Sequence, residues 1–170
     1  MAFELKEKYP DSYIPMQFSN PDNPKAHKQT ADEIIKDTEG KSIVAVAGIG
    51  TGGTAFGLKE YLPSDAIVYG VEPEESPLFT KGFAGAHKIQ GIGANFIPKI
   101  TNGKNLDGII TVKSEDAIES AKELARTHGI FCGISAGANL CAAEMLANKY
   151  PEKLIVSIVP DSGERYLSIW

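Results

Sequence analysis

The chain has 170 residues, of which 42% are hydrophobic and 23% are charged, and its formal net charge is −5 at pH 7. This composition predicts one globular domain with a single core, and it argues against a basic nucleic-acid-binding surface. No apolar run approaches the roughly 20 residues that a membrane helix needs, and the charged N-terminus does not resemble a signal peptide. We therefore expect a cytoplasmic protein with neither a nucleic-acid nor a membrane partner.

Apolar runs that alternate with helix-like segments organise the chain. In chain order, we expect a helix tail at 3–8, an extended edge or short strand at 13–18, a helix that Asn23 caps and Gly40 ends, a strand at 43–47, a helix at 55–62, a strand at 66–71, an irregular stretch at 74–103, a strand at 108–112, a helix that Ser114 caps and Gly129 ends, a helix at 134–148 and a strand at 154–159. This alternation predicts a three-layer α/β fold, in which a mostly parallel sheet is flanked by helices. Ligands of such sheets bind at the carboxyl ends of the strands.

The positions of cysteine and histidine argue against a metal site. Cys132 and Cys141 lie in apolar surroundings, and His27, His87 and His128 are scattered along the chain. Neither residue type shows the spacing of metal ligands. We expect two buried, reduced thiols and no bound metal.

A glycine-rich loop, Gly-Ile-Gly-Thr-Gly-Gly-Thr at 48–54, joins the strand at 43–47 to the following helix. Glycines let backbone N–H groups approach a phosphate closely, and the helix N-terminus adds positive potential. Thr51 and Thr54 contribute hydroxyl donors. The loop therefore predicts an anion site, and the question is which phosphate it binds.

The same loop also fits a nucleotide-binding pattern. Gly48, Gly50 and Gly53 match the Gly-x-Gly-x-x-Gly fingerprint, and Glu72 ends the next strand near the offset expected of a ribose ligand. A Rossmann-type nucleotide binder is therefore one alternative. It explains neither the two threonines nor the Pro-Asp-Ser-Gly turn at 160–163, which follows the last strand at the same expected edge of the sheet.

Blocks of residues along nearly the whole chain carry a more specific resemblance. They are Gln-Phe-Ser-Asn-Pro at 17–21, Asn23, Pro24 and His27, the glycine loop at 48–54, Val-Glu-Pro at 71–73, Ser76 and Pro77, His-Lys-Ile-Gln-Gly-Ile-Gly-Ala at 87–94, Phe-Ile-Pro at 96–98, Gly-Ile-Ser-Ala-Gly-Ala at 133–138 and Ser-Gly-Glu-Arg-Tyr-Leu-Ser at 162–168. In this order they resemble the cysteine synthases (O-acetylserine sulfhydrylases), which are tryptophan-synthase-β-like, fold type II pyridoxal-phosphate enzymes. The resemblance implies the large-domain fold of that family.

The resemblance also implies how the cofactor, pyridoxal 5′-phosphate, is held. The phosphate would be bound by Gly50, Thr51, Gly52, Gly53 and Thr54. Ser162 occupies the family position that meets the pyridine nitrogen, and Asp161 is the competing candidate. A neutral hydroxyl there limits the electron-sink strength of the ring and suits elimination at the β-carbon.

The implied substrate is a small amino acid. Gln17 matches the glutamine that helps to bind the substrate carboxylate, and Gly91 and Ile92 belong to a stretch that lines the substrate cleft. The implied reaction replaces the acetate of O-acetylserine by sulfide and yields cysteine.

Two family motifs have no counterpart in this sequence. One is the Ser-x-Lys-Asp-Arg type motif, whose lysine binds the cofactor covalently and transfers protons, and the other is the Ser-Gly-Asn-Thr-Gly type loop. Both motifs belong to the N-terminal part of the family. Lys88 is a poor substitute, because members of the family have this lysine in addition to the one that binds the cofactor. We therefore expect residues 1–170 to be a single C-terminal cofactor-binding domain without its N-terminal domain, with non-covalent cofactor binding at most and no catalytic residue of its own.

Three functional hypotheses follow. The chain is an incomplete cysteine synthase that needs a complementary N-terminal segment, a non-catalytic phosphate-binding or protein-interaction module, or a nucleotide binder. The second would associate with serine acetyltransferase, as whole family members do. Because the face that meets the N-terminal domain would be apolar and exposed, we also expect self-association.

Overall fold

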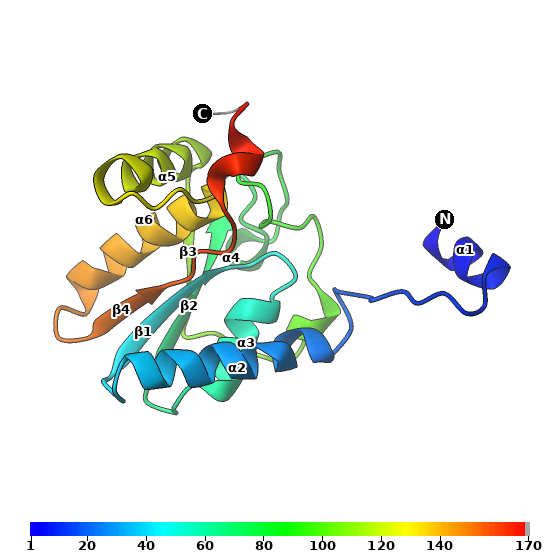
Figure 1. The fold of residues 1–170 in the computed structure, drawn as a ribbon, viewed down its shortest axis with the longest axis horizontal. Helices are drawn as coiled ribbons and strands as arrows, with labels where there is room; N and C mark the ends of the chain where they lie inside the picture. Colours follow the sequence, from blue (N-terminus) through cyan, green and yellow to red (C-terminus); the bar gives the residue numbers. More distant parts are fainter. Residues whose placement is uncertain (169–170) are drawn as a thin grey trace.

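The computed structural model describes residues 1–168, and its core is a sheet of four parallel strands in the order β3-β2-β1-β4. The strands are β1 (Ile43–Gly48), β2 (Ile67–Pro73), β3 (Gly108–Val112) and β4 (Leu154–Ser157). The helices are α1 (Ala2–Lys8), α2 (Asp22–Asp37), α3 (Gly53–Tyr61), α4 (Leu78–Lys81), α5 (Ser114–His128) and α6 (Ile134–Lys149), with short 3₁₀ turns η1 (Lys99–Thr101) and η2 (Gly163–Tyr166). The α/β prediction is confirmed (Figure 1).

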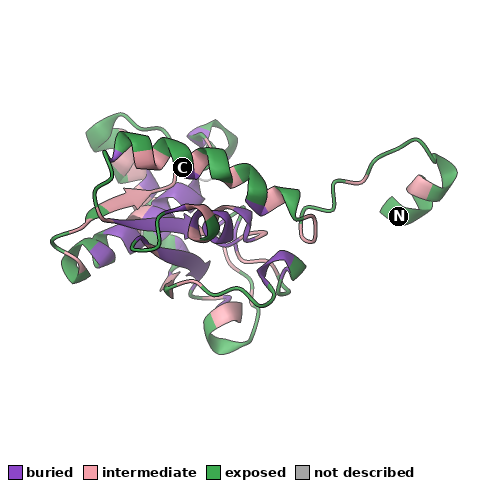
Figure 2. Cartoon of the chain, turned by 90° about the horizontal axis from the view of Figure 1, so that it is seen from below, coloured by how far each residue is buried: buried purple, intermediate pink, exposed green. Residues whose placement is uncertain are grey.

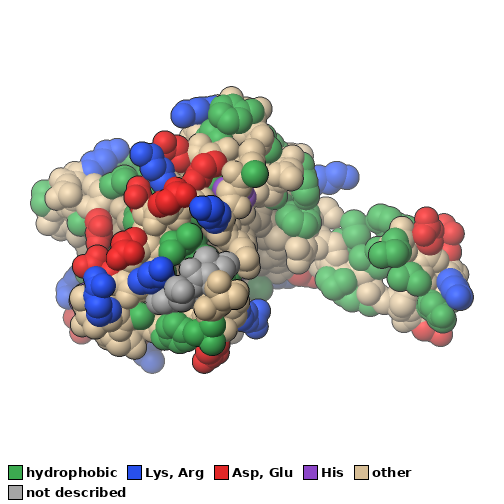
Figure 3. All heavy atoms as spheres, turned by 90° about the horizontal axis from the view of Figure 1, so that it is seen from above, with side chains coloured by type: hydrophobic (Ala, Val, Ile, Leu, Met, Phe, Trp, Pro, Cys, Tyr) green, Lys and Arg blue, Asp and Glu red, His purple; other side chains and the backbone are tan. Residues whose placement is uncertain are grey.

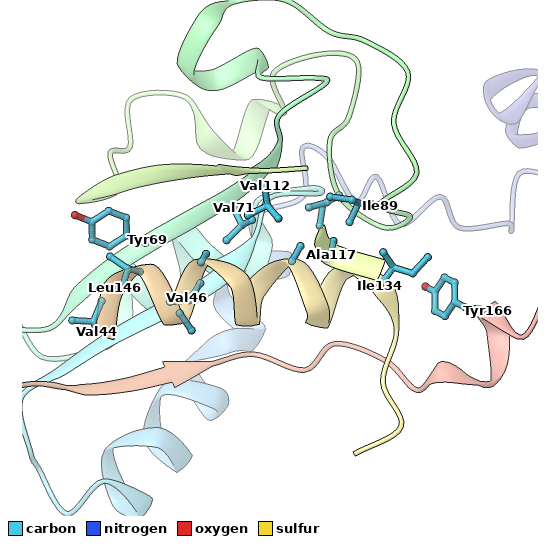
Figure 4. Close-up of a cluster of buried hydrophobic side chains, with 14 residues drawn as sticks. Val44, Val46, Tyr69, Val71, Ile89, Val112, Ala117, Ile134, Leu146 and Tyr166 are labelled. Carbon is cyan, nitrogen blue, oxygen red and sulfur yellow. The ribbon is translucent and has the colours of Figure 1, made fainter. Parts of the chain in front are cut away.

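Helices cover both faces of the sheet, which gives the predicted three layers. Side chains alternate along β1, so Val44 and Val46 pack toward α6 while Ala45 and Ala47 pack toward α2 and α3. Leu146 of α6 lies over the first pair (Figure 4). The buried residues concentrate in the sheet and in the helix faces against it (Figure 2). Burial on both sides explains why β1 reads as a continuous apolar run.

The N-terminal segment stands away from this body (Figure 1). α1 buries none of its residues, and hydrophobic side chains are visible on its surface (Figure 3). The strand predicted at 13–18 is wrong. Met16 adopts a left-handed conformation with φ 52°, and its carbonyl oxygen accepts hydrogen bonds from the N–H groups of Ser19 and Asn20. The chain therefore turns here instead of extending.

Two predicted helix N-caps are also wrong. α2 begins at Asp22 with Pro21 as its N-cap, and the Asn23 side chain makes contacts outside the helix. The Ser114 hydroxyl accepts a hydrogen bond from the backbone N–H of Lys88 and does not cap α5. Of the two glycines predicted to end helices, Gly129 is confirmed, because it follows α5 in the left-handed conformation with φ 69°. The prediction for Gly40 is wrong, because α2 ends at Asp37 with Thr38 as its C-cap.

Within residues 1–168, no helix is both long and apolar enough to cross a bilayer.

Candidate functional site

A cavity of about 390 Å³ opens at the carboxyl ends of β1 and β4. It is lined by Gln17, Ala47, Gly48, Gly50, Thr51, Gly52, Gly53, Thr54, Gly91, Ile92, Ser135, Ile158, Pro160 and Asp161. All the binding residues predicted from the sequence are among them, with the exception of Ser162. The fold thus brings together segments that lie far apart in the sequence, and the roles of the individual residues stay predictions.

The glycine loop packs directly against the segment at 91–93. The N–H of Gly93 donates to the carbonyl oxygen of Ile49 at 2.9 Å, and the Gly91 carbonyl oxygen fills the space that a Cβ on Gly50 would need. Next to them, the side chain of Ile92 fills the Cβ space of Gly48. Because the atom that it would meet belongs to the backbone, a side chain at Gly50 would push the two walls of the cavity apart.

The helix that leaves this loop starts without a capping side chain. Gly52 is the N-cap of α3, with φ 87°, and the cap makes no side-chain hydrogen bond. An uncapped first turn presents backbone N–H groups and the positive end of the helix dipole. In this turn the N–H of Gly53 already donates to Thr51 Oγ1, and both Gly53 and Thr54 line the cavity.

Side chains from α2 hold both threonine hydroxyls of the loop. Thr51 Oγ1 accepts hydrogen bonds from Asn23 Nδ2 at 3.0 Å and from the N–H of Gly53 at 3.1 Å. Thr54 Oγ1 lies 3.1 Å from His27 Nε2. Asn23 and His27 are four residues apart and so lie on one face of the helix. The i, i+4 spacing opposite a Thr-x-x-Thr pair was the available signal, but it identified neither role from the sequence.

The surroundings of His27 favour the neutral form of its ring. Burial lowers its pKa below the ordinary histidine value, and its Nδ1 atom lies 3.3 Å from Thr30 Oγ1. A neutral imidazole has one donor and one acceptor nitrogen, so it exchanges a single hydrogen bond with Thr54.

The opposite wall contains residues that the sequence left without a firm role. Asp161 Oδ2 accepts a hydrogen bond from the Tyr166 hydroxyl at 2.6 Å, while its Oδ1 is buried with no partner among the described residues. Burial, together with the adjacent Asp161, raises the pKa of Tyr166 to about 12. Ser162 is exposed, and its hydroxyl donates to Glu164 Oε2 at 2.8 Å. Of the two candidates for the pyridine nitrogen, it is therefore Asp161 that lines the cavity.

Glu72 does not face the cavity, which weakens the nucleotide-binding alternative. Its carboxylate is buried and accepts hydrogen bonds from the backbone N–H groups of Phe79 at 2.8 Å and Thr80 at 3.0 Å. The Thr80 hydroxyl donates to it as well. Glu72 therefore holds α4 in place and is not available to a ribose.

The two cysteines are not among the residues that line the cavity. Cys132 is buried as predicted, Cys141 is partly buried, and both are free thiols. In the part of the chain that the structure describes, no group of three His, Cys, Asp or Glu side chains could hold a metal ion. The same residues include no lysine among those that line the cavity.

The donors around the cavity fit a phosphate. Both acceptor positions of the Thr51 hydroxyl are filled, so its proton remains to be donated, and the uncapped N-terminus of α3 adds backbone donors beside it.

The sequence profile of one protein family, described as pyridoxal-phosphate dependent enzyme, matches residues 1–161. This chain belongs to that family. Among relatives, the chain is 53% identical over 172 residues to cysteine synthase B of Campylobacter jejuni, covering 98% of this chain and 57% of the relative. It is 43% identical over 182 residues to cysteine synthase A of Escherichia coli K12, covering 98% and 56%.

Solved structures of this pyridoxal-phosphate dependent family share the fold. A cysteine synthase from Entamoeba histolytica superposes with a TM-score of 0.92 at 41% identity, covering 98% of this chain and 51% of that one. An O-acetylserine dependent cystathionine beta-synthase from Helicobacter pylori gives 0.90 at 40% identity, covering 98% and 56%. The chain thus spans only a little over half the length of these proteins.

Proposed function

We propose that the chain is the cofactor-binding part of a cysteine-synthase-type enzyme, which replaces the acetate of O-acetylserine by sulfide in the cytoplasm. The observation that carries this proposal is the meeting of the glycine–threonine loop, Gln17 and the segment at 91–92 around one cavity. The cysteine synthases among its relatives support the same assignment.

Residues of this chain would hold each end of pyridoxal phosphate. The loop at 50–54 would bind the phosphate through backbone N–H groups and the hydroxyls of Thr51 and Thr54. Asp161 or Ser162 would contact the pyridine nitrogen. Ser162 could do so only after the hydrogen bond from its hydroxyl to Glu164 is broken. A carboxylate would keep that nitrogen protonated, whereas a serine hydroxyl would leave it neutral.

The bound cofactor supplies an electron sink for the α-carbon of an amino acid, which permits a leaving group to depart from the β-carbon. The chain's own residues orient the substrate. Gln17 would donate its side-chain amide to the substrate carboxylate, and Ile92 would exclude water from the reacting face. Because no described residue lining the cavity is a lysine, we propose that this chain binds the cofactor non-covalently and does not turn over alone.

Titration of the 170-residue chain with pyridoxal 5′-phosphate and, separately, with NAD tests this proposal. Pyridoxal phosphate should bind, and Thr51→Val should weaken its binding by about 10- to 100-fold, as expected for a lost hydrogen bond to a charged group. Thr127→Val, on the exposed end of α5, is the matched control. Tight NAD binding without pyridoxal phosphate binding would favour the nucleotide binder instead. Borohydride reduction that fixes one cofactor per chain on a lysine would refute non-covalent binding.

We also propose that the exposed apolar side of α1 mediates association, either with another copy of the chain or with the complementary segment of a longer protein. Phe3 is 65% and Leu5 is 50% exposed in this helix. Serine acetyltransferase is the other partner that family membership suggests. Size-exclusion chromatography with light scattering should show self-association at high concentration, and a clean monomer there would contradict it.

A further inference from the structure

One amide group connects the two sides of the candidate site. Asn23 Nδ2 donates to the backbone carbonyl oxygen of Gln17 at 2.7 Å and to Thr51 Oγ1 at 3.0 Å. The start of α2 does not use this side chain, since Pro21 is the N-cap and the N–H of Asp22 bonds to Asn20. Asn23 is therefore free to join the segment before α2 to the glycine loop.

The orientation of this amide follows from its partners. A backbone carbonyl oxygen only accepts hydrogen bonds, so the NH₂ group of Asn23, and not its oxygen, has to face Gln17. The amide oxygen then lies against Gly53, where it fills the space of a Cβ. The contacts of Asn23 with Gln17 and Gly53 therefore require that Asn23 donates to Thr51, rather than accepts from it.

The donated hydrogen bond sets the direction of the Thr51 proton. A hydroxyl has one proton and two acceptor positions, and those of Thr51 are filled by Asn23 Nδ2 and by the N–H of Gly53. The proton has to be donated in the remaining direction, and Thr51 lines the cavity. A hydroxyl constrained in this way is prepared to donate to an anion, without first having to rotate away from another acceptor.

We infer that Asn23 is a positioning residue, which holds the Thr51 hydroxyl as a donor toward the cofactor phosphate and fixes the Gln17 segment to the same loop. The inference rests on the proposed function, because the phosphate is that of pyridoxal phosphate. Asn23 acts through Thr51 and does not touch the cofactor. Its two hydrogen bonds join the glycine loop, expected to bind the phosphate, to Gln17, expected to bind the substrate carboxylate.

A double-mutant cycle on the intact 170-residue chain tests this role. Asn23→Leu keeps the size of the side chain but removes its donors, and calorimetry with pyridoxal 5′-phosphate should show about tenfold weaker binding. If Asn23 acts through the hydroxyl, adding Asn23→Leu to Thr51→Val should weaken binding little further. Asn148→Leu, on the exposed end of α6, is the matched control and should bind as the unmodified chain does.

Asn23→Asp supplies a second variant of nearly unchanged shape. The introduced carboxylate only accepts, so the Thr51 proton would turn toward it and away from the cavity, and binding should fall by more than in Asn23→Leu. Pyridoxal, which lacks the phosphate, should show little difference between the variants. Full additivity in the cycle, or normal binding by both Asn23 variants, would overturn the inference while the proposed function stands. No binding of pyridoxal phosphate by the unmodified chain would overturn both.

Discussion

The carbonyl oxygen of Gly91 occupies the space that a Cβ atom on Gly50 would need. These residues belong to different walls of the cavity, and the hydrogen bond from Gly93 to Ile49 holds the walls together beside them. The absence of a side chain on Gly50 therefore sets the width of the cavity at the loop expected to bind phosphate. A glycine is needed at position 50 so that two backbones can approach closely. This reason differs from the need for glycine in a left-handed turn.

Gly50→Ala should weaken pyridoxal phosphate binding by about tenfold or more, because the new methyl group would displace Gly91 and open the cavity. Calorimetric titration measures the affinity. Gly129→Ala is a useful control, since Gly129 caps α5 in the left-handed conformation and has no atom in its Cβ space. That variant should lose about 1 kcal/mol of unfolding free energy and bind normally. Equal affinities for Gly50→Ala and the unmodified chain would contradict the close-approach argument.

His27 should make the stability of the chain depend on pH in the mildly acidic range. Burial lowers its pKa in the folded state, so the unfolded chain takes up the proton at a higher pH. The free energy of unfolding should consequently fall as the pH drops below the ordinary histidine value of about 6.5. Urea unfolding at several pH values between about 5 and 7.5 measures this slope.

His27→Gln should flatten that slope, and His128→Gln, at the exposed end of α5, is the matched control. The carboxylate of Asp107 does not contribute to this slope. Burial alone would raise the pKa of Asp107, but hydrogen bonds from Lys59 and from the N–H of Val68 outweigh it and hold the pKa below its ordinary value. Its contribution is therefore lost only at a lower pH than the interval measured. An unchanged slope in His27→Gln would show that another group is responsible.

The sequence predicted those features that short-range patterns control. β1 and β3 could be predicted because each contains a short run rich in β-branched residues, and the loop at 48–54 because glycines and threonines gather at a strand end. The side chain of Asn23 could not, since a capping role within α2 and a hydrogen bond to Thr51 use the same chemistry. Only the packing of α2 against α3 distinguishes the two.

Glu72 and Ser162 illustrate the same limit. Glu72 lies near the end of β2 and Ser162 follows β4, both at the carboxyl edge of the sheet, but α4 lies close enough to Glu72 to use its carboxylate, and Glu164 accepts the Ser162 hydroxyl proton. Position along a strand predicts the edge that a residue occupies, and it does not predict which neighbour the side chain binds. Asp161 lines the cavity, and Tyr166 holds its Oδ2.

Glu72→Gln should destabilise the chain by about 1–3 kcal/mol without weakening pyridoxal phosphate binding. The amide would turn an NH₂ group toward the backbone N–H of Phe79 or Thr80, and so leave a buried donor without an acceptor. Urea unfolding measures the loss. Glu74→Gln, at an exposed neighbouring position, should cost little. A stable Glu72→Gln that binds less cofactor would instead indicate a direct role for Glu72 at the site.

Tyr166 should ionise at a higher pH than an ordinary tyrosine does. Burial and the hydrogen bond to Asp161 raise its pKa to about 12, above the ordinary value of about 10. The folded state therefore retains this proton longer than the unfolded state does. The stability linked to it is complete below about pH 10 and is lost as the pH rises toward the folded pKa. Absorbance at the tyrosinate band, followed as the pH is raised, should show a late phase.

Tyr166→Phe should remove that late phase and leave the partly buried carboxylate of Asp161 without its hydrogen bond. Because an unsatisfied, partly buried carboxylate is costly, we expect a loss of about 1–3 kcal/mol in unfolding free energy. Tyr13→Phe is the matched control, as this side chain is 76% exposed on the N-terminal segment and its loss should leave the late phase intact. A late phase that persists in Tyr166→Phe would assign it to another tyrosine, and the proposed support of Asp161 by Tyr166 would then be wrong.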